Sequence, residues 1–247
     1  MIPLDDRGLL LGDGLFETML AVDGAIPRIE AHLDRMAAGC ATLSLPALDR
    51  EAARALCLDA PPAAGRFAVR LTLTAGSGGR GLDRPADIAP RLVAAAAPAP
   101  RVETPATLII AQTRRNEGSL AARLKTLSYV DGVLARAEAR AAGADEAVML
   151  NNRGEVACAA AANVFWIEGR RVLTPSLDCG VLAGIARARV LSQIEVAEVV
   201  ADRARLEAAD GLFLTNSLIG IRPVSRLGER AFEPHPLAAR LREALDG

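Results

Sequence analysis

The most informative segment of the chain is KTLSY at residues 125–129, which leads into a helical pattern at 130–142 closed by Gly143. Its first residue, Lys125, is the only lysine among 29 lysine and arginine residues. An arginine side chain stays protonated, whereas a lysine amine can lose its proton and form a Schiff base with a carbonyl compound. Lys125 is therefore a candidate catalytic residue, although composition alone leaves a random surface lysine open.

Composition excludes several classes of function. Apolar residues make up 51% of the 247 and charged residues 24%, which is typical of a soluble globular protein. A net charge of −1 gives no electrostatic reason to expect nucleic acid or an anionic membrane as a partner, and no apolar run approaches the ~20 residues of a membrane span. The N-terminus lacks a signal-peptide pattern, and four scattered cysteines with two histidines do not form a zinc-site pattern. We expect a cytoplasmic protein with free thiols and no metal, acting on a small-molecule substrate.

An alanine- and proline-rich stretch at 94–106 divides the chain. We expect a smaller N-terminal domain at 1–98, a linker at 99–106 and a larger cofactor-binding domain at 107–247. The first part is predicted to hold strands at 15–22, 67–74 and 91–97 and helices at 29–43 and 49–58, with Asp23-Gly24 as a two-residue hairpin turn returning through 25–28. In the second part helices and strands mix without strict alternation, which favours an α+β fold over a doubly wound sheet.

Three motifs in the first part are candidates for ligand binding. DRGLLLGDGLFET at residues 6–18 places glycines just before a strand, where the chain either approaches a ligand or makes an ordinary turn. His32 and Arg35 are three residues apart on one helical face, so Arg35 either binds a phosphate or is a solvated surface residue. The loop GSGGRG at 76–81 carries Arg80 at its tip and lacks the Lys-[Ser/Thr] ending of a nucleotide P-loop, which excludes that interpretation.

In this order, these pieces resemble the class IV pyridoxal-phosphate enzymes, a family that contains branched-chain and D-amino-acid aminotransferases and 4-amino-4-deoxychorismate lyase. The resemblance runs from residue 6 to about 224. KTLSY at 125–129 is similar to the motif of the cofactor lysine. DEAV at 145–148, NVFW at 163–166 and TPSLDCGVLAGIAR at 174–187 are also similar to family motifs. The resemblance implies a two-domain α+β fold of fold type IV, with pyridoxal 5′-phosphate between the domains, and a homodimer.

The resemblance also implies roles for individual residues. Lys125 would bind pyridoxal phosphate covalently and shuttle protons, and Arg35 would bind the phosphate. The backbone amides of Ile185 and Ala186, which open a helix after Gly184, and the hydroxyl of Ser217 would complete the phosphate site. Free amides and the positive end of a helix dipole favour an anion, so this arrangement is physically sensible. Tyr129, the only tyrosine, is either a contact of the cofactor or substrate or a packed core residue.

One position departs from the family. Relatives place a glutamate five residues before the asparagine of the Asn-x-Phe motif, where it keeps the pyridine nitrogen of the cofactor protonated, and this chain has Cys158 there. Glu155 lies three residues earlier, so on a regular strand it faces the opposite side and does not replace the missing carboxylate unless a bulge intervenes. A thiol pairs less well with a pyridinium, which disfavours transamination more than an elimination driven by aromatisation. An inactive or repurposed relative is the alternative.

Within the family, the GSGGRG loop, AANVFW at 161–166 and the short chain resemble 4-amino-4-deoxychorismate lyase, which releases pyruvate and 4-aminobenzoate, a folate precursor. The resemblance implies that Lys125 removes the C4 proton of the substrate as a general base. Arg80 is the candidate for a substrate carboxylate, and Thr18 is expected near the cofactor. An aminotransferase acting on D- or branched-chain amino acids is the second hypothesis. A non-catalytic binding protein that keeps the fold is the third.

Overall fold

The computed structural model describes residues 2–246, and contacts between its residues separate two compact units. The first unit runs to Pro100 and also contains Leu124–Ser128, and the second contains Arg101–Arg123 and continues from Tyr129. The sequence analysis placed Lys125 in the C-terminal domain, whereas its contacts belong to the first unit. The reason is that residues 125–127 pair with a strand of that unit, as described below.

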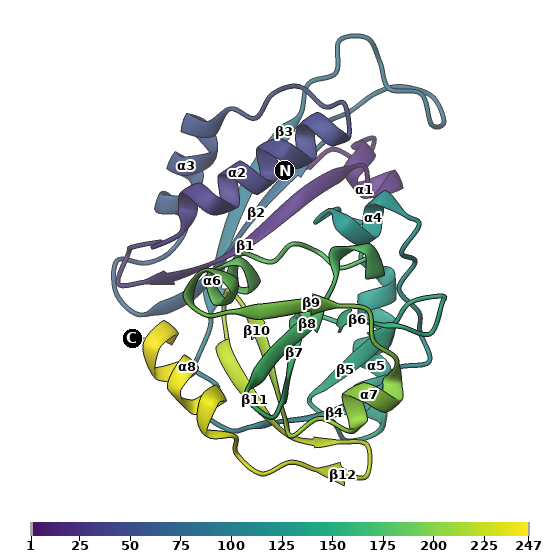
Figure 1. The fold of residues 1–247 in the computed structure, drawn as a ribbon. Coiled ribbons are helices and arrows are strands. Elements are labelled where there is room, and N and C mark those ends of the chain that lie inside the picture. The colour runs from purple at the N-terminus through teal and green to yellow at the C-terminus, as the bar shows by residue number, and fades with distance from the viewer. Residues whose placement is uncertain (1, 247) are drawn as a thin grey trace. The chain divides into compact units, whose positions relative to one another are not determined.

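The first unit is an antiparallel sheet with two helices on one face (Figure 1). Its elements in chain order are α1 (Arg7–Leu11), β1 (Gly14–Val22), α2 (Ile29–Thr42), α3 (Arg50–Asp59), β2 (Arg66–Thr74) and β3 (Arg91–Pro98). The strands lie in the order β1-β2-β3. Side chains alternate along a strand, so β1 buries Leu15, Met19 and Ala21 against Leu33 and other core residues of α2 and α3. Phe16 and Thr18 therefore face the opposite side of the sheet.

Asp23 and Gly24 form the tight turn that their sequence predicts. Their φ angles are 48° and 78°, and Val22 and Ala25 exchange two backbone hydrogen bonds of 2.9 and 3.0 Å. Positive φ at both central residues is the signature of a type I′ turn. The predicted return strand at 25–28 is wrong, because pairing stops at the Val22–Ala25 bridge and β1 pairs with β2 instead.

The second unit holds a mixed sheet with the order β6-β5-β4-β11-β10-β7-β8-β9, in which β12 also pairs with β11. Its strands are β4 (Ala106–Ile110), β5 (Glu146–Leu150), β6 (Val156–Ala159), β7 (Asn163–Glu168), β8 (Arg171–Pro175), β9 (Val196–Val199), β10 (Gly211–Asn216), β11 (Gly220–Leu227) and β12 (Arg230–Ala231). Its helices are α4 (Leu120–Arg123), α5 (Val130–Ala141), the 3-10 helix η1 (Leu177–Cys179), α6 (Ile185–Gln193), α7 (Arg203–Glu207) and α8 (Pro236–Asp246). The pairs β4–β5, β4–β11 and β8–β9 are parallel and the others antiparallel. This mixture confirms the predicted α+β class.

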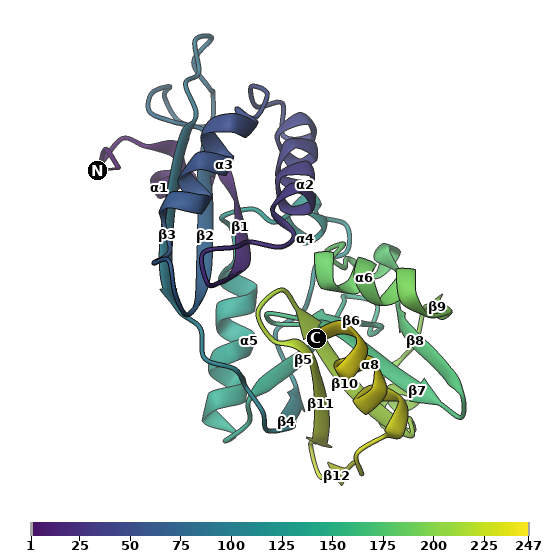
Figure 2. The same cartoon turned by 90° about the vertical axis from the view of Figure 1, so that its left-hand side faces the viewer.

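Helices cover this sheet through small and aromatic residues. Ala135 and Ala139 of α5 pack against Met149 of β5 in a buried cluster. Phe165 of β7 stacks on Phe213 of β10 with ring centroids 4.9 Å apart, in a cluster that also contains residues of α6 and α8. Figure 2 shows α8 beside β10 and β11. Neither α8 nor β9 was expected from the sequence.

Candidate active site

Lys125 lies on a short segment that extends the sheet of the first unit. Phe16 N–H donates to the Lys125 carbonyl at 2.9 Å, Leu127 N–H donates to the Gly14 carbonyl at 3.0 Å, and Leu15 is bridged to Thr126. Residues 125–127 therefore pair with the free edge of β1 through a single antiparallel bridge. Because side chains alternate, Lys125 points to the face of Phe16, and its Nζ lies 4.1 Å from the centroid of the Phe16 ring.

The same face of the sheet carries further groups suited to an anionic, planar ligand. The guanidinium carbon of Arg70 on β2 lies 3.8 Å from the Phe16 ring centroid. Thr18, the predicted neighbour of the cofactor, is two residues along β1 and half-buried on this side. Sequence reasoning missed Phe16 and Arg70, although strand alternation, which places both on the face away from the core, is the signal that could have found them.

Arg35 lies on the other face of β1, in contact with a buried carboxylate. Its Nε and one terminal nitrogen donate to the two oxygens of Glu17 at 2.8 and 2.6 Å, and His32 Nδ1 lies 2.6 Å from Glu17 Oε2. His32 and Arg35 thus share a helix face, as their spacing predicts. Glu17 is only 1% exposed. Burial acts to raise its pKa, but the hydrogen bonds from His32 and Arg35 outweigh burial and hold the pKa below its usual value.

The pairing with Glu17 fixes the guanidinium plane of Arg35. A fork held on one edge by a carboxylate is preorganised, so less side-chain freedom is lost when the arginine binds a second anion. Whether Arg35 binds a phosphate stays a prediction. Glu17 itself was not singled out from the sequence, although its place on the core face of a strand is a signal, since a carboxylate there requires a partner.

In the second unit, the start of α6 has the properties of an anion site. Gly184 is the N-cap, and no side chain caps the first turn, whose amides belong to Ile185 and Ala186. A Cβ added to Gly184 would come within 2.0 Å of Asn163 Oδ1, and the Asn163 amide donates to the Leu182 carbonyl at 3.1 Å. The asparagine of NVFW therefore holds the loop that leads into GIAR, which is why these two motifs occur together.

Ser217 and Tyr129 also lie in the second unit. Ser217 is half-buried in the turn between β10 and β11, where Asn216 accepts hydrogen bonds from the amides of Leu218 and Ile219. The Tyr129 ring lies over Gly132, since a Cβ there would be 3.3 Å from its Cδ1. Both residues are half-buried, and their predicted contacts with a ligand stay predictions.

Cys158 lies on β6 next to a β-bulge. Met149 pairs with Cys158 and Leu150 with Val156, so Ala157 is an extra residue without a partner of its own. The bulge reverses the alternation, and Glu155 therefore shares a face with Cys158, contrary to the expectation for a regular strand. Even so, the Glu155 carboxylate is held in the adjoining turn, where it accepts hydrogen bonds from Asn151 at 2.7 Å and Arg153 at 2.9 Å.

The thiol of Cys158 is buried in a small cluster with Ala157, Cys179 and Val181. Burial raises its pKa, the nearby charge of Glu146 adds to this, and Arg115 acts in the opposite direction without reversing the shift. Cys158 is therefore a neutral thiol at neutral pH. Arg115 is buried as well and donates to the carbonyls of Gly180 and Ala122. Arg115 and Cys158 are distant in the sequence and come near each other only through the tertiary fold. The sequence around either residue therefore does not predict their proximity.

Within each unit, taken separately, there are groups that suit one part of pyridoxal phosphate. A primary amine over an aromatic ring suits an aldehyde on a flat heterocycle, and uncapped amides at a helix start suit a phosphate. In addition, Thr126 Oγ1, adjacent to Lys125, is buried and has no hydrogen-bond partner within residues 2–246, which is the kind of group that a ligand satisfies. Arg80, the predicted substrate contact, is exposed in the loop between β2 and β3. No helix in the described part of the chain is long and apolar enough to cross a membrane.

Known proteins are similar to this chain in sequence and in fold. Residues 14–227 match the family model described as Amino-transferase class IV. Aminodeoxychorismate lyase of Vibrio harveyi is 30% identical over 234 residues, which cover 91% of this chain and 86% of that protein. The crystal structure of 4-amino-4-deoxychorismate lyase from Pseudomonas aeruginosa has a TM-score of 0.90 at 33% identity, covering 99% of this chain and 94% of that one. Branched-chain amino acid aminotransferase of Escherichia coli, at 22% identity, has a TM-score of 0.90 over 99% of this chain and 88% of its own, which confirms the predicted fold.

Proposed function

This chain belongs to the class IV aminotransferase family, and we propose that within this family it is a pyridoxal-phosphate-dependent 4-amino-4-deoxychorismate lyase. Two relatives that carry this name, from Vibrio harveyi and Pseudomonas aeruginosa, match over most of their length. The observation that favours the lyase over an aminotransferase is Cys158, a buried thiol where the resemblance places a glutamate in relatives, because loss of that carboxylate weakens transamination more than an elimination driven by aromatisation. The aromatic ring that forms in the lyase reaction supplies driving force, so this reaction depends less on a strong electron sink.

The reaction needs one mobile proton, and Lys125 is the group placed to move it. When bound, pyridoxal phosphate supplies an electron sink next to the substrate nitrogen. The Lys125 amine takes the proton from C4 as general base, the bond from the ring to the enolpyruvyl oxygen breaks, and the ring becomes aromatic. Lys125 then returns the proton to the methylene carbon of the departing enolpyruvate, which leaves as pyruvate. No oxidant, reductant or net proton is required.

The remaining residues bind and orient. The amides of Ile185 and Ala186, at the start of α6, would donate hydrogen bonds to the phosphate, and Arg35, held by Glu17, would supply a fixed positive charge to it. Phe16 presents a flat apolar surface beside the Lys125 amine and excludes water from it. Arg80 binds a substrate carboxylate, for which its planar fork is suited.

A homodimer is part of this proposal. Apolar side chains are exposed on α1, where Leu9 and Leu10 are 59% and 64% exposed, and on α5, where Val130 and Val133 are 66% and 64% exposed. Exposed apolar side chains clustered on short helices are typical of surfaces that pair with another chain. Light scattering on the purified protein is expected to give twice the mass of one chain, and a mass of one chain would refute the dimer.

The lyase is tested by incubating the holoenzyme with 4-amino-4-deoxychorismate and no keto acid. Pyruvate and 4-aminobenzoate are expected to appear in equal amounts. Release of product only after a keto acid is added, together with amino transfer from D- or branched-chain amino acids, would support the aminotransferase instead. Protein that stays colourless after incubation with pyridoxal phosphate would support a non-catalytic relative.

A further inference from the structure

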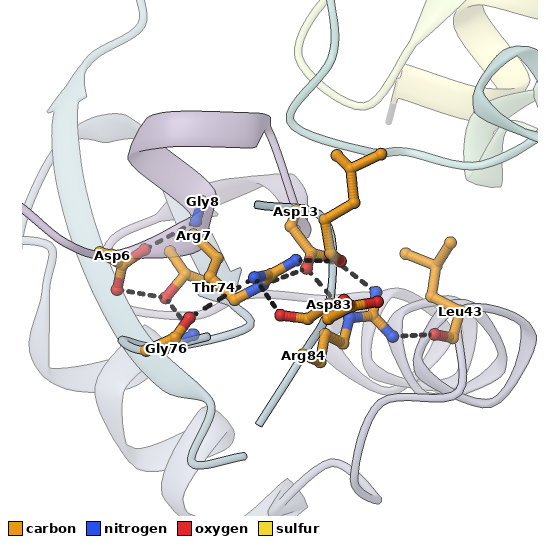
Figure 3. Close-up of polar contacts among 11 residues, drawn as sticks. Asp6, Arg7, Gly8, Asp13, Leu43, Thr74, Gly76, Asp83 and Arg84 are labelled. Carbon is orange, nitrogen blue, oxygen red and sulfur yellow. Dashed lines mark hydrogen bonds and ion pairs between the residues drawn. The ribbon is translucent and has the colours of Figure 1, made fainter. Parts of the chain in front are cut away.

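The loop between β2 and β3, residues 75–90, is tied to the N-terminal helix by one buried arginine (Figure 3). Arg7 is only 4% exposed, and its two terminal nitrogens donate to the carbonyls of Leu82 at 2.8 Å and Asp83 at 2.9 Å. Its Nε donates to Asp13 at 2.9 Å. A single side chain from α1 thus holds the far half of the loop through that half's backbone.

Asp13 joins this arginine to a second one. Arg84, at the end of the same loop, places its Nε 3.0 Å from Asp13 Oδ2 and a terminal nitrogen 2.5 Å from Oδ1, and it also donates to the Leu43 carbonyl after α2. The hydrogen bond from Arg84, helped by Arg7, holds the pKa of Asp13 below its usual value. Asp13 is therefore a charged junction between α1, α2 and the loop. We call Arg7, Asp13 and Arg84 the loop clamp.

The near half of the loop is fixed as well. Asp6 caps α1 and accepts a hydrogen bond from the Thr74 hydroxyl at 2.8 Å, and the amide of Arg7 donates to the Gly76 carbonyl at 2.8 Å. Gly76 has a φ of 83°, and a Cβ there would be 2.0 Å from the Ala89 carbonyl oxygen. The two halves approach so closely that only glycine fits at this point.

Arg80 lies at the tip of the loop, outside the residues that form the loop clamp. A Cβ on Gly79 would be 2.2 Å from the Asp83 carbonyl oxygen, so the loop is narrow up to this residue, whereas a Cβ on Gly81 meets nothing within 4 Å. Arg80 and the side chain of Leu82 are exposed. A charged side chain at the tip of a rigidly held loop is suited to binding a ligand, because the loop loses little further conformational freedom when the ligand binds.

The clamp is also continuous with the Lys125 segment. The amide of Ala75, at the base of the loop, donates to the Asp13 carbonyl at 2.9 Å, and Gly14, the next residue, accepts from Leu127 at 3.0 Å. Asp13 thus stands between the segment that bears the reactive amine and the loop that bears Arg80. A shift of the loop relative to Asp13 therefore changes the distance between Arg80 and Lys125, which a bound substrate has to span.

We propose that Arg7, Asp13 and Arg84 are positioning residues that fix the β2–β3 loop, so that Arg80 meets the substrate carboxylate at a set place relative to Lys125. The inference rests on the proposed function in one respect, namely that Arg80 binds a carboxylate of the substrate. It adds residues to which the sequence assigned no role, and it separates them from groups that touch the reacting atoms.

The test uses three variants of the holoenzyme. Arg84→Gln removes one side of the clamp at a partly exposed position and is the variant most certain to fold. Arg84→Lys keeps the charge, and Arg50→Gln is the matched control, since it removes an exposed ion pair with Asp34 in the same unit. For each variant, the readouts are hydrogen exchange of residues 75–90, the Kd of 4-aminobenzoate measured by calorimetry, and KM and kcat.

For Arg84→Gln we expect faster exchange in the loop, about tenfold weaker binding of 4-aminobenzoate and a similar rise in KM, with kcat within about twofold of the parent. Arg84→Lys is expected to recover part of both effects, and Arg50→Gln to show neither. Unchanged loop exchange in Arg84→Gln would overturn the proposal, and so would faster exchange with unchanged Kd and KM. A kcat that falls as much as kcat/KM would also overturn it, because it indicates damage to the reacting centre.

The two proposals fail separately. If the parent enzyme releases no pyruvate from 4-amino-4-deoxychorismate but transfers amino groups to an added keto acid, the lyase assignment fails, and the clamp is then judged by the KM of the amino acid substrate, which also carries a carboxylate. If the parent is a lyase and Arg84→Gln binds 4-aminobenzoate as tightly as the parent does, the clamp proposal alone is refuted.

Discussion

Two buried ionisable groups, Glu17 in the first unit and Cys158 in the second, have pKa values that are shifted in opposite directions under similar burial. Glu17 is 1% exposed and Cys158 7% exposed. Glu17 has His32 and Arg35 in direct contact, and its pKa lies below the usual value. Cys158 has apolar neighbours and only a more distant arginine, so burial raises its pKa. Burial alone therefore does not set the direction of a pKa shift, because hydrogen-bond donors in direct contact with the group can reverse the effect of burial.

The two units therefore carry different kinds of functional group. The first unit holds fixed charges and the Lys125 amine, and the second offers neutral donors, the thiol of Cys158 and the amides of α6. Under the proposed function, Cys158 would present a neutral side chain to the pyridine nitrogen of the cofactor. The following predictions test whether each group behaves as its surroundings require.

The largest effect is expected from Lys125→Arg, which keeps a positive charge and removes the amine that can lose its proton. We expect acceptor-independent release of pyruvate to fall by about 10³-fold or more, because an arginine at this position stays protonated and cannot take up the proton. The unfolding midpoint in urea should stay close to that of the parent. Residual turnover above a tenth of the parent rate would show that Lys125 does not do this chemistry.

Glu17→Gln removes the charge of the buried carboxylate in the first unit. Removing a buried carboxylate leaves Arg35 and His32 without their partner, and we expect the free energy of unfolding to fall by about 3 kcal/mol. Urea denaturation measures this change. Glu30→Gln on α2, the helix that carries His32 and Arg35, removes exposed ion pairs with Arg50 and Arg54 and should have little effect. Equal losses in both variants would mean that burial of the Glu17 cluster is not what stabilises it.

Cys158→Glu replaces the neutral thiol in the second unit with a carboxyl group that can ionise. With Arg115 near, the new carboxylate is expected to ionise and to strengthen the electron sink, which should raise acceptor-dependent amino transfer by about tenfold and shift the absorption spectrum of the bound cofactor. Cys158→Ser is the matched control and should leave both unchanged. Identical spectra and rates in all three proteins would show that position 158 does not face the cofactor.

The smallest expected effect is a pH dependence of stability. The pKa of Glu17 in the folded protein lies below its usual value of 4.5, so its ionisation stabilises the fold fully above about pH 4.5, and this contribution is lost as the pH falls through the lower folded value. The difference in unfolding free energy between the parent and Glu17→Gln should therefore be constant from pH 7 to about 5 and shrink below that range. A difference that grows in acid would contradict the sign of the shift.

Much of the fold was predictable because its signals are local. The strand at 15–22 and the helix at 29–43 match β1 and α2 to within one residue at either end, since alternation and helical spacing act over neighbouring residues. The turn at Asp23-Gly24 was predictable for the same reason. The motif residues follow from resemblance, and the structure adds that NVFW and GIAR are joined by Asn163 at the start of α6.

The rest depends on contacts between distant residues. Pairing of Thr126 with Leu15 places Lys125 in the first unit, and nothing near residue 125 indicates it. The bulge at Ala157 occurs in a run of small residues without periodicity. The sequence therefore does not predict on which face of the strand Glu155 lies. Arg84 and Asp13 are 71 positions apart, and their contact depends on how the loop folds back.

The most direct test of the account is borohydride reduction of the protein incubated with pyridoxal phosphate, followed by tryptic mapping. Because a labelled lysine resists trypsin, we expect one phosphopyridoxyl peptide that starts after Arg123 and runs through residue 125 to Arg136. A label on any other peptide, or no label in protein that is folded and mixed with excess pyridoxal phosphate, would contradict the assignment of Lys125.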